Sequence, residues 1–374
     1  MGTSRREFIR MAGTGALILG FSPVLGGCVG VTRSDMTSGS TQEVPVPGLE
    51  ASMAEILRLA SLAPSGHNMQ PWFVRRLKPY EYVIGMDKAR LLPAVDPDNR
   101  EAILSIGAFV ENLCSAASSF GYDAQVEVIG TSASDEKLVK LTLTKTKPSG
   151  FPISRISSRR TVKKGFQQNP LSADHTNTLT AVWPGHIFYF NQDSRHAKCL
   201  PDWVAESFKY QTSRDDAQRE LANCIRLKKS DALKFRYGLT TESMEITGVA
   251  GWYVRTFMNN EDVMGTTFRN QGIDQYSAMA KQGAGWIIIT SEGNTVTDLI
   301  ETGRRFERMA LMVREMGIAI HPMTQILEEK RWRDQYTSLH RSAMEPQFIL
   351  RVGYLDSYPD PVSIRRPVAW FLQT

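Results

Sequence analysis

The segment from Ala63 to Trp72 carries residue types suited to holding a small polar molecule. It reads Ala-Pro-Ser-Gly-His-Asn-Met-Gln-Pro-Trp, after a predicted helix over 53–62 and before a β-rich run. Proline ends the helix, and the residues after it favour a turn. Such a loop presents hydroxyl, amide and backbone N–H groups that can bind the polar edge of a flat heterocycle, although a purely structural turn uses the same residue types. The candidate binding residues of this loop are Pro64, Ser65, Gly66, Asn68 and Gln70.

This loop resembles the Ala-Pro-Ser-x-x-Asn-x-Gln-Pro-Trp motif of the nitroreductase family, whose members bind FMN between two subunits. Two further segments match that family. Arg159-Arg160-Thr161-Val162-Lys163 resembles its Arg-Arg-Ser/Thr-x-Arg stretch, and Arg351-Val352-Gly353-Tyr354 with Arg365-Arg366-Pro367 resembles its closing strand and basic pair. The resemblance covers roughly 53–367 and is nearest to the Acg-like branch, in which two nitroreductase halves are fused in one chain.

The resemblance implies that the two basic segments hold the phosphate of one non-covalently bound FMN. Guanidinium and hydroxyl groups suit that task because they make charge-assisted hydrogen bonds to phosphate oxygens. Lys163 stands where the family usually has arginine, so the charge is kept and the planar fork is lost. For Arg365 and Arg366, two ordinary surface arginines are the alternative. The phosphate-binding candidates are Arg159, Arg160, Thr161, Lys163, Arg365 and Arg366.

No catalytic side chain is assigned, because the flavin itself performs the redox chemistry in such proteins. The stretch from Gly317 to Met323 would lie where the family passes its backbone close to the reactive flavin nitrogen. His321 in this stretch is a weak candidate for a proton donor, since a lone histidine is more often a packed or surface residue. Ser65 and His67, two residues apart in a turn, do not indicate a catalytic triad.

A glycine pattern recurs at an offset of 196 residues. Gly107, Glu111 and Gly121 have the spacing Gly-x3-Glu-x9-Gly, and the same spacing returns at 303–317. Apolar residues fall at helical spacing between the glycines in both copies, and a β-rich run follows each. The chain is therefore predicted to consist of two related α+β halves, and the resemblance implies a nitroreductase-like fold in which these duplicated halves form an intramolecular pseudo-dimer.

The expected organisation has four parts. A signal peptide spans 1–28, a flexible linker 29–48, the first half 49–150, and the second half 151–374 with a helical insertion at about 202–281. The insertion is interpreted either as an extra helical layer on the core or as a lid over a pocket.

The N-terminus resembles an export signal. Arg5-Arg6-Glu7-Phe8-Ile9 precedes a short apolar stretch, which is typical of twin-arginine signals that carry folded proteins. Leu25-Gly26-Gly27-Cys28 resembles a lipoprotein cleavage box, with simple cleavage nearby as the alternative to acylation of Cys28. The expected location is the periplasm or the extracytoplasmic face of the membrane, with the twin-arginine export machinery as a partner.

Composition excludes several other classes of function. The net charge of +5 is mild and spread along the chain, so no nucleic-acid partner is expected. Four cysteines without metal-ligand spacing predict neither a zinc site nor a disulfide framework, and Cys114 is expected to be buried and inert. After the first 30 residues no apolar run reaches 18 residues, so membrane contact is expected only through a lipid anchor.

These observations together predict an exported FMN-dependent oxidoreductase. It would pass hydride from reduced FMN to a small organic acceptor, such as a nitroaromatic or a quinone. The electron donor is NAD(P)H or, because nicotinamides are scarce outside the cytoplasm, a quinone or protein donor. The alternative is an FMN-binding protein without turnover, in which the insertion caps the flavin.

Overall fold

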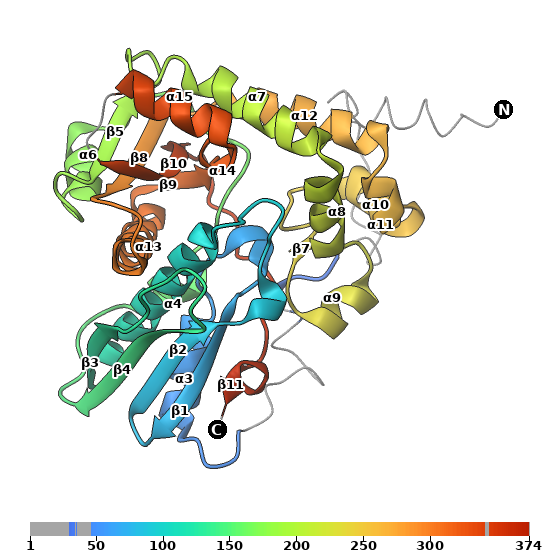
Figure 1. The fold of residues 1–374 in the computed structure, drawn as a ribbon. Coiled ribbons are helices and arrows are strands. Elements are labelled where there is room, and N and C mark those ends of the chain that lie inside the picture. The colour runs from blue at the N-terminus through green and yellow to red at the C-terminus, as the bar shows by residue number, and fades with distance from the viewer. Residues whose placement is uncertain (1–29, 34, 36–45, 341–343, 374) are drawn as a thin grey trace.

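The computed structural model describes residues 30–33, 35, 46–340 and 344–373 (Figure 1). The fold is mixed α+β, as expected, and has two main sheets. The first contains β1 (Trp72–Lys78), β2 (Glu81–Met86), β3 (Tyr122–Val128), β4 (Lys137–Lys145) and β11 (Leu372–Gln373). The second contains β5 (Ile187–Asn191), β8 (Gly285–Ser291), β9 (Ile318–Pro322) and β10 (Glu345–Tyr354).

The two sheets share one strand order. The first runs β11-β1-β2-β4-β3 and the second β5-β8-β10-β9. When β11 is left out, the strands of each sheet are ordered from edge to edge as the first, second, fourth and third in chain order. Every pair of neighbouring strands is antiparallel. Strand β11 pairs in parallel with β1 through Val74 and Leu372, so the C-terminus of the chain completes the edge of the first sheet.

Two helices pack against each other between the sheets, α4 (Arg100–Ser119) and α13 (Val296–Ala310) (Figure 1). Asp96 accepts hydrogen bonds from the first-turn N–H groups of Glu101 and Ala102, and Thr295 and Asp298 form a capping box at the start of α13. By length and composition alone, α4 is the one helix among the described residues that could cross a membrane, but 78% of its most apolar window is buried inside the protein.

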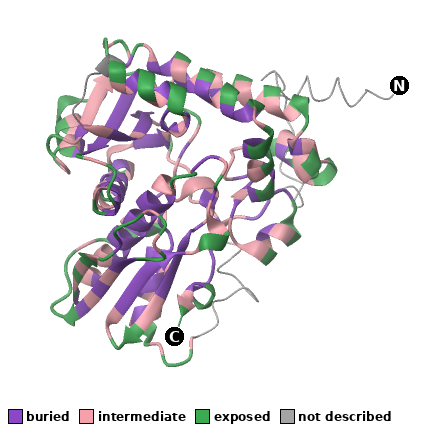
Figure 2. Cartoon of the chain, in the orientation of Figure 1, coloured by how far each residue is buried: buried purple, intermediate pink, exposed green. Residues whose placement is uncertain are grey.

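The largest core lies under the first sheet, where α3 (Ala51–Ala60) and α4 cover one face. Its centre includes Trp72 and Phe109, whose ring centroids lie 4.9 Å apart. A second core joins α13 to one face of the second sheet, and a third fills the opposite face. Figure 2 shows these buried positions along the strands and the facing helices.

The chain between β5 and β8 is mainly helical. It contains α7 (Leu200–Ser213), α8 (Asp215–Cys224), α9 (Lys229–Phe235), α10 (Gly248–Phe257), α11 (Asn260–Val263) and α12 (Thr266–Ala280), with a short pair of strands, β6 (Ile225–Arg226) and β7 (Leu239–Thr240). Helices α7 and α12 lie over the second sheet with α14 (Gln325–Glu328) and α15 (Lys330–His340), whereas α8 and α9 extend toward the first (Figure 1).

The connecting segments contain short helical turns. These are η2 (Gly66–Asn68), η3 (Lys88–Arg90), α5 (Ser154–Ser158), α6 (Ala173–Thr180), η4 (Val313–Met316) and η5 (Val368–Trp370). Within the part of the chain that the structure describes, no group of three or more His, Cys, Asp and Glu side chains is placed to hold a metal ion.

Candidate functional site

The loop between α3 and β1 holds an unusual backbone. His67, Asn68 and Gln70 have φ values of 45°, 55° and 55°, so three non-glycine residues out of four are left-handed. Each such residue costs about 1–3 kcal/mol unless its surroundings hold it in place. Concentrated left-handed backbone of this kind is found at ligand-binding loops, which makes this loop the starting point of the site.

Asn68 is held from two distant parts of the chain. Its Nδ2 donates to the carbonyl oxygens of Gly238 (3.0 Å) and Ile364 (3.1 Å), and its Oδ1 accepts from Arg365 (2.7 Å). The other N–H groups of Arg365 donate to carbonyl oxygens of 61–63, at the end of α3, and of Ile364. All five N–H groups of this guanidinium therefore bind the protein, and Arg365 clamps the loop instead of presenting free donors.

Gln70 is fully engaged in the same way. Its Nε2 donates to Arg236 O (3.1 Å) and its Oε1 accepts from the backbone N–H of Arg366 (2.9 Å). The guanidinium of Arg366 returns hydrogen bonds to the carbonyls of Gln70 (2.7 Å) and Trp72 (2.6 Å). Arg365 and Arg366 are 7% and 1% exposed, so neither is a surface arginine. The side-chain amides of Asn68 and Gln70 and the basic pair Arg365-Arg366 therefore hold the loop in its conformation.

The remaining loop candidates are Ser65, Pro64 and Gly66, next to the half-buried His67. Ser65 Oγ accepts from the N–H of Gln70 (2.9 Å), Pro64 is half-buried, and a Cβ on Gly66 would lie 3.0 Å from Oε2 of Glu101. His67 Nδ1 is buried without a hydrogen-bond partner. Burial lowers the pKa of His67, which favours its neutral imidazole.

Arg159 joins the second basic segment to this loop. Its Nη2 donates to the carbonyl of Leu62 (3.4 Å), one residue before the turn, and its Nε lies 3.3 Å from Oε1 of Glu307. Glu307 is fully buried, and burial raises its pKa to about 7. The structure thus brings the start of the 63–72 loop and the basic segment at 159–163 together through Arg159.

A glutamate of the helical insertion organises the rest of the basic segment. Glu245 lies 3.2 Å from Arg160 Nη2 and accepts the backbone N–H of Lys163 (3.0 Å). Its backbone carbonyl accepts from Lys164 Nζ (2.9 Å). Burial lowers the pKa of Lys163, and Thr161 is half-buried beside it. Glu245 was not predicted, because nothing in its local sequence marks it as a partner of residues some 80 positions earlier.

His321 lies against a buried arginine. Its Nδ1 is 3.3 Å from Nη2 of Arg351, which also donates to the carbonyl of Lys163 (2.6 Å) and stacks over Phe166 at 4.1 Å. A guanidinium can only donate, so Nδ1 of His321 accepts and its proton sits on Nε2. Burial, then Arg351 and Lys163, hold the pKa of His321 well below its usual value. Its neutral imidazole can donate a hydrogen bond but carries no acidic proton.

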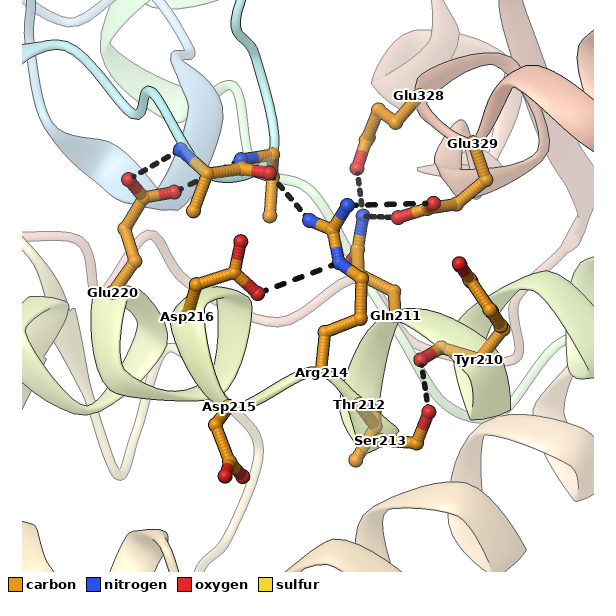
Figure 3. Close-up of polar contacts among 12 residues, drawn as sticks. Tyr210, Gln211, Thr212, Ser213, Arg214, Asp215, Asp216, Glu220, Glu328 and Glu329 are labelled. Carbon is orange, nitrogen blue, oxygen red and sulfur yellow. Dashed lines mark hydrogen bonds and ion pairs between the residues drawn. The ribbon is translucent and has the colours of Figure 1, made fainter.

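A polar cluster ties the insertion to α14 (Figure 3). Gln211 Nε2, at the end of α7, donates to Glu328 Oε2 (2.6 Å) and Glu329 Oε1 (3.3 Å). The Oγ1 of Thr324 lies 3.0 Å from Glu101 Oε1 and 3.3 Å from Glu328 Oε1, which brings two carboxyl groups to one hydroxyl that can donate to only one of them. Burial, then Glu101, raises the pKa of Glu328 well above its usual value.

The same cluster also reaches the loop that precedes α4 (Figure 3). Glu220 of α8 accepts the backbone N–H groups of Ala94 (2.9 Å) and Val95 (3.2 Å). Arg214, between α7 and α8, donates to the carbonyl of Ala94 and lies 3.6 Å from Glu329. The insertion is therefore fixed to both halves beside the candidate site.

The donor set fits an anionic ligand such as the phosphate of FMN. Arg159 and Arg365 are both buried near Glu307, a carboxyl group whose raised pKa makes it weak compensation. The buried Nε atoms of Arg159 and Arg160 have no hydrogen-bond partner, although Arg159 Nε lies 3.3 Å from Glu307 and Arg160 is paired with Glu245 through Nη2. Buried cations without full compensation are costly unless an anion joins them, and phosphate oxygens would supply the missing acceptors.

Three expectations from the sequence concern residues away from this site: the twin-arginine signal, the acylated Cys28 and the inert thiol of Cys114. Arg5, Arg6 and Cys28 lie outside the described residues. Cys114 is free, and burial raises the pKa of its thiol to about 12, in keeping with the inert thiol that was expected.

No family model matches the chain, but several known proteins match most of it. PigM of a Serratia species, named a probable NAD(P)H nitroreductase, is 21% identical over 329 residues, covering 81% of this chain and 88% of PigM. Two putative NAD(P)H nitroreductases of Mycobacterium tuberculosis are each 24% identical. One matches over 313 residues (82% of this chain, 86% of the relative) and the other, acg, over 322 (83% and 92%). The chain is similar, at low identity over most of its length, to proteins named NAD(P)H nitroreductases.

Proposed function

We propose that this protein is an FMN-dependent oxidoreductase of the nitroreductase type. The observation that carries the proposal is the junction of the strained 64–70 loop with the buried, incompletely neutralised arginines of the second half. Relatives named NAD(P)H nitroreductases over most of the chain support it. The acceptor would be a small organic molecule, either a nitroaromatic or a quinone, and the donor NAD(P)H or a quinone or protein donor.

Some of the candidate residues would bind the ligand, and others keep the binding residues in position. Arg159, Arg160, Thr161 and Lys163 would bind the phosphate, and the 64–67 backbone with His67 Nδ1 would face the polar edge of the ring system. Asn68, Gln70, Arg365 and Arg366 act as positioning residues, because their polar groups are mostly bound to the protein. When bound, the flavin would supply the hydride chemistry.

The proposal includes a pseudo-dimer. Each half would contribute what a separate subunit contributes in a two-chain member of the family, so that one chain makes one site. The shared strand order of the two sheets supports this arrangement. So does the contact between α4 and α13, the helices that carry the repeated glycine pattern.

A second candidate is an FMN-binding protein without turnover. It is favoured by the insertion, whose Glu245, Arg236 and Gly238 contact both site segments and would cap a bound flavin. Absorbance spectra separate the two functions. The reductase predicts a yellow protein with one FMN per chain that NADPH, or a reduced quinone or protein donor, bleaches and a nitroaromatic or quinone recolours.

Flavin that only dithionite bleaches, with none of these donors effective, would favour the binding protein. Protein that takes up no added FMN would contradict both functions.

We further propose that the protein is exported by the twin-arginine route and held at the extracytoplasmic face by acylation of Cys28. The support is the sequence alone, with Arg5-Arg6 before an apolar stretch and the Leu25–Cys28 box. Replacing both arginines by lysine should keep the protein in the cytoplasm. Cys28→Ala should move it from the membrane fraction to the soluble periplasmic fraction. Membrane association that is unchanged in Cys28→Ala would contradict acylation.

A further inference from the structure

The first described residues pack on the body of the protein. The N–H of Gly30 donates to Glu242 Oε1 (3.1 Å), and Val31, 3% exposed, lies in a small apolar cluster with Ala232 and Ile364. This packing differs from the flexible linker expected for residues 29–48 from their composition. Val31 and Gly30 place the following residue pair, Thr32 and Arg33, beside the candidate site.

Arg33 bridges the two basic segments. Its Nη1 donates to the carbonyl of Ser157 (2.9 Å) and its Nε to the carbonyl of Ser363 (3.4 Å). These carbonyls lie two residues before Arg159 and two residues before Arg365. A single side chain from the N-terminal segment therefore spans the chain segments that the candidate phosphate site is built from.

Arg33 also joins the cluster electrostatically. Burial, then Arg159, lowers the pKa of Arg33 to about 9, and burial, then Arg33, lowers the pKa of Arg365 well below its usual value. The two other arginines that act on Arg33 have their own carboxylates. Arg58 is paired with Glu55 (2.6 Å) and Arg160 with Glu245 (3.2 Å).

The charges of this cluster do not balance. Arg159 and Arg365 share one carboxyl group, that of Glu307, and Arg33 adds a third positive charge beside these two arginines. Taking charges out of water is costly unless opposite charges accompany them. Even with Glu307 ionised, three guanidinium groups and one carboxylate leave two positive charges. A phosphate dianion would offset both of them, and a neutral ligand would offset neither.

We propose that Arg33 completes the phosphate site, so that bound FMN and the segment around residues 30–35 hold each other in place. This inference rests on the proposed FMN function. Its consequence is that cofactor loading fixes the segment that directly follows the predicted export signal. A phosphate-bearing flavin does this and riboflavin, which lacks the phosphate, does not.

The test compares FMN with riboflavin in the full chain. Quenching of flavin fluorescence gives both dissociation constants for wild type, Arg33→Gln, Arg33→Lys and the control Arg75→Gln, whose side chain binds the exposed Gln373. Arg33→Gln should weaken FMN binding by roughly tenfold or more, the effect of one charged hydrogen bond. Riboflavin binding should not change, Arg33→Lys should restore part of the FMN affinity, and Arg75→Gln should match wild type.

Melting temperatures distinguish a ligand role from a structural one. Without flavin, Arg33→Gln should melt no lower than wild type, because it removes repulsion from Arg159 and Arg365. With FMN its stabilisation should be smaller. A variant that melts lower both with and without FMN, while its FMN affinity is unchanged, would show a structural role and overturn the proposal.

Limited proteolysis with trypsin tests the proposal on the wild-type protein. FMN should slow cleavage after Arg33, and riboflavin should not. Equal FMN affinity in wild type and Arg33→Gln would refute the role of Arg33, and tighter binding in the variant would show that Arg33 competes with the phosphate. If wild type binds neither flavin, the proposed function itself fails.

Discussion

Gly107 of α4 and Gly303 of α13 meet where the two helices cross. A Cβ on either glycine would lie 3.0 Å from the Cα of the other, and it would overlap a carbonyl oxygen of the facing helix, Ile300 O or Leu104 O. Only a residue without a side chain fits on both sides of such a crossing. The two helices that cross here, α4 and α13, lie between the two sheets, so this crossing fixes how closely they approach each other.

Gly303→Ala should therefore destabilise the protein. The added methyl group has no room, and overpacking of this kind costs about 1–3 kcal/mol. Urea unfolding followed by circular dichroism measures the change. The control is Gly272→Ala in α12, where a Cβ has nothing within 4 Å, and there alanine should stabilise the helix by about 0.5–1 kcal/mol. Equal effects at the two positions would contradict close packing at the crossing.

The helix pair could be predicted from the sequence because its signal is local. Glycine spacing and apolar periodicity lie within about twenty residues in each copy, and α4 forms where the pattern places it. Helix α13 ends at Ala310, short of the predicted stop at Gly317, and a separate 3-10 turn covers Val313–Met316. The loop was also recognisable, since its residue types fit a turn whether or not a ligand is bound.

The roles of individual side chains could not be predicted in the same way. Arg365 was expected to reach phosphate, but its acceptors at 61–63 and Asn68 lie some 300 residues away and no local pattern announces them. Arg33 lies in a stretch whose composition reads as a linker, and only the folded chain shows its two carbonyl partners. Long-range pairing of this kind is decided by tertiary contacts.

Arg365→Lys should loosen the loop while keeping the charge. Lysine has three donors on one nitrogen and cannot reproduce five hydrogen bonds in a planar fork, so carbonyls at 61–63 would lose partners. Amide hydrogen exchange of 65–70 should become faster, and stability should fall by about 1–3 kcal/mol.

Arg75→Lys is the matched control, because the polar partners of that side chain, Gln373 and Glu136, are exposed. Unchanged exchange in Arg365→Lys would mean that the loop holds its left-handed backbone without the clamp.

The half-buried carboxyl group of Glu328 should make stability depend on pH. Its folded pKa lies well above the usual 4.5, so the native state holds a proton that the unfolded chain releases. The free energy of unfolding should therefore decrease as pH rises above about 4.5. In Glu328→Gln this contribution is absent, and the decrease measured by urea unfolding between about pH 5 and about pH 8 should be smaller.

Glu292→Gln serves as the control, since that side chain is 79% exposed. Its pH dependence should follow wild type. A steeper dependence in Glu328→Gln than in wild type would reverse the sign that burial implies.

His321 should not set the pH dependence of flavin reduction. Burial and the neighbouring cations Arg351 and Lys163 keep its pKa well below the usual 6.5, so it is already neutral at about pH 6 and stays neutral at higher pH. Stopped-flow reduction rates of wild type and His321→Asn, measured from about pH 6 to about pH 8.5, should give profiles of the same shape. The variant's rate at each pH should be scaled by one constant factor, because the substitution changes packing and not protonation. An inflection between pH 6 and 7.5 that is present in wild type and lost in the variant would instead identify His321 as the proton donor.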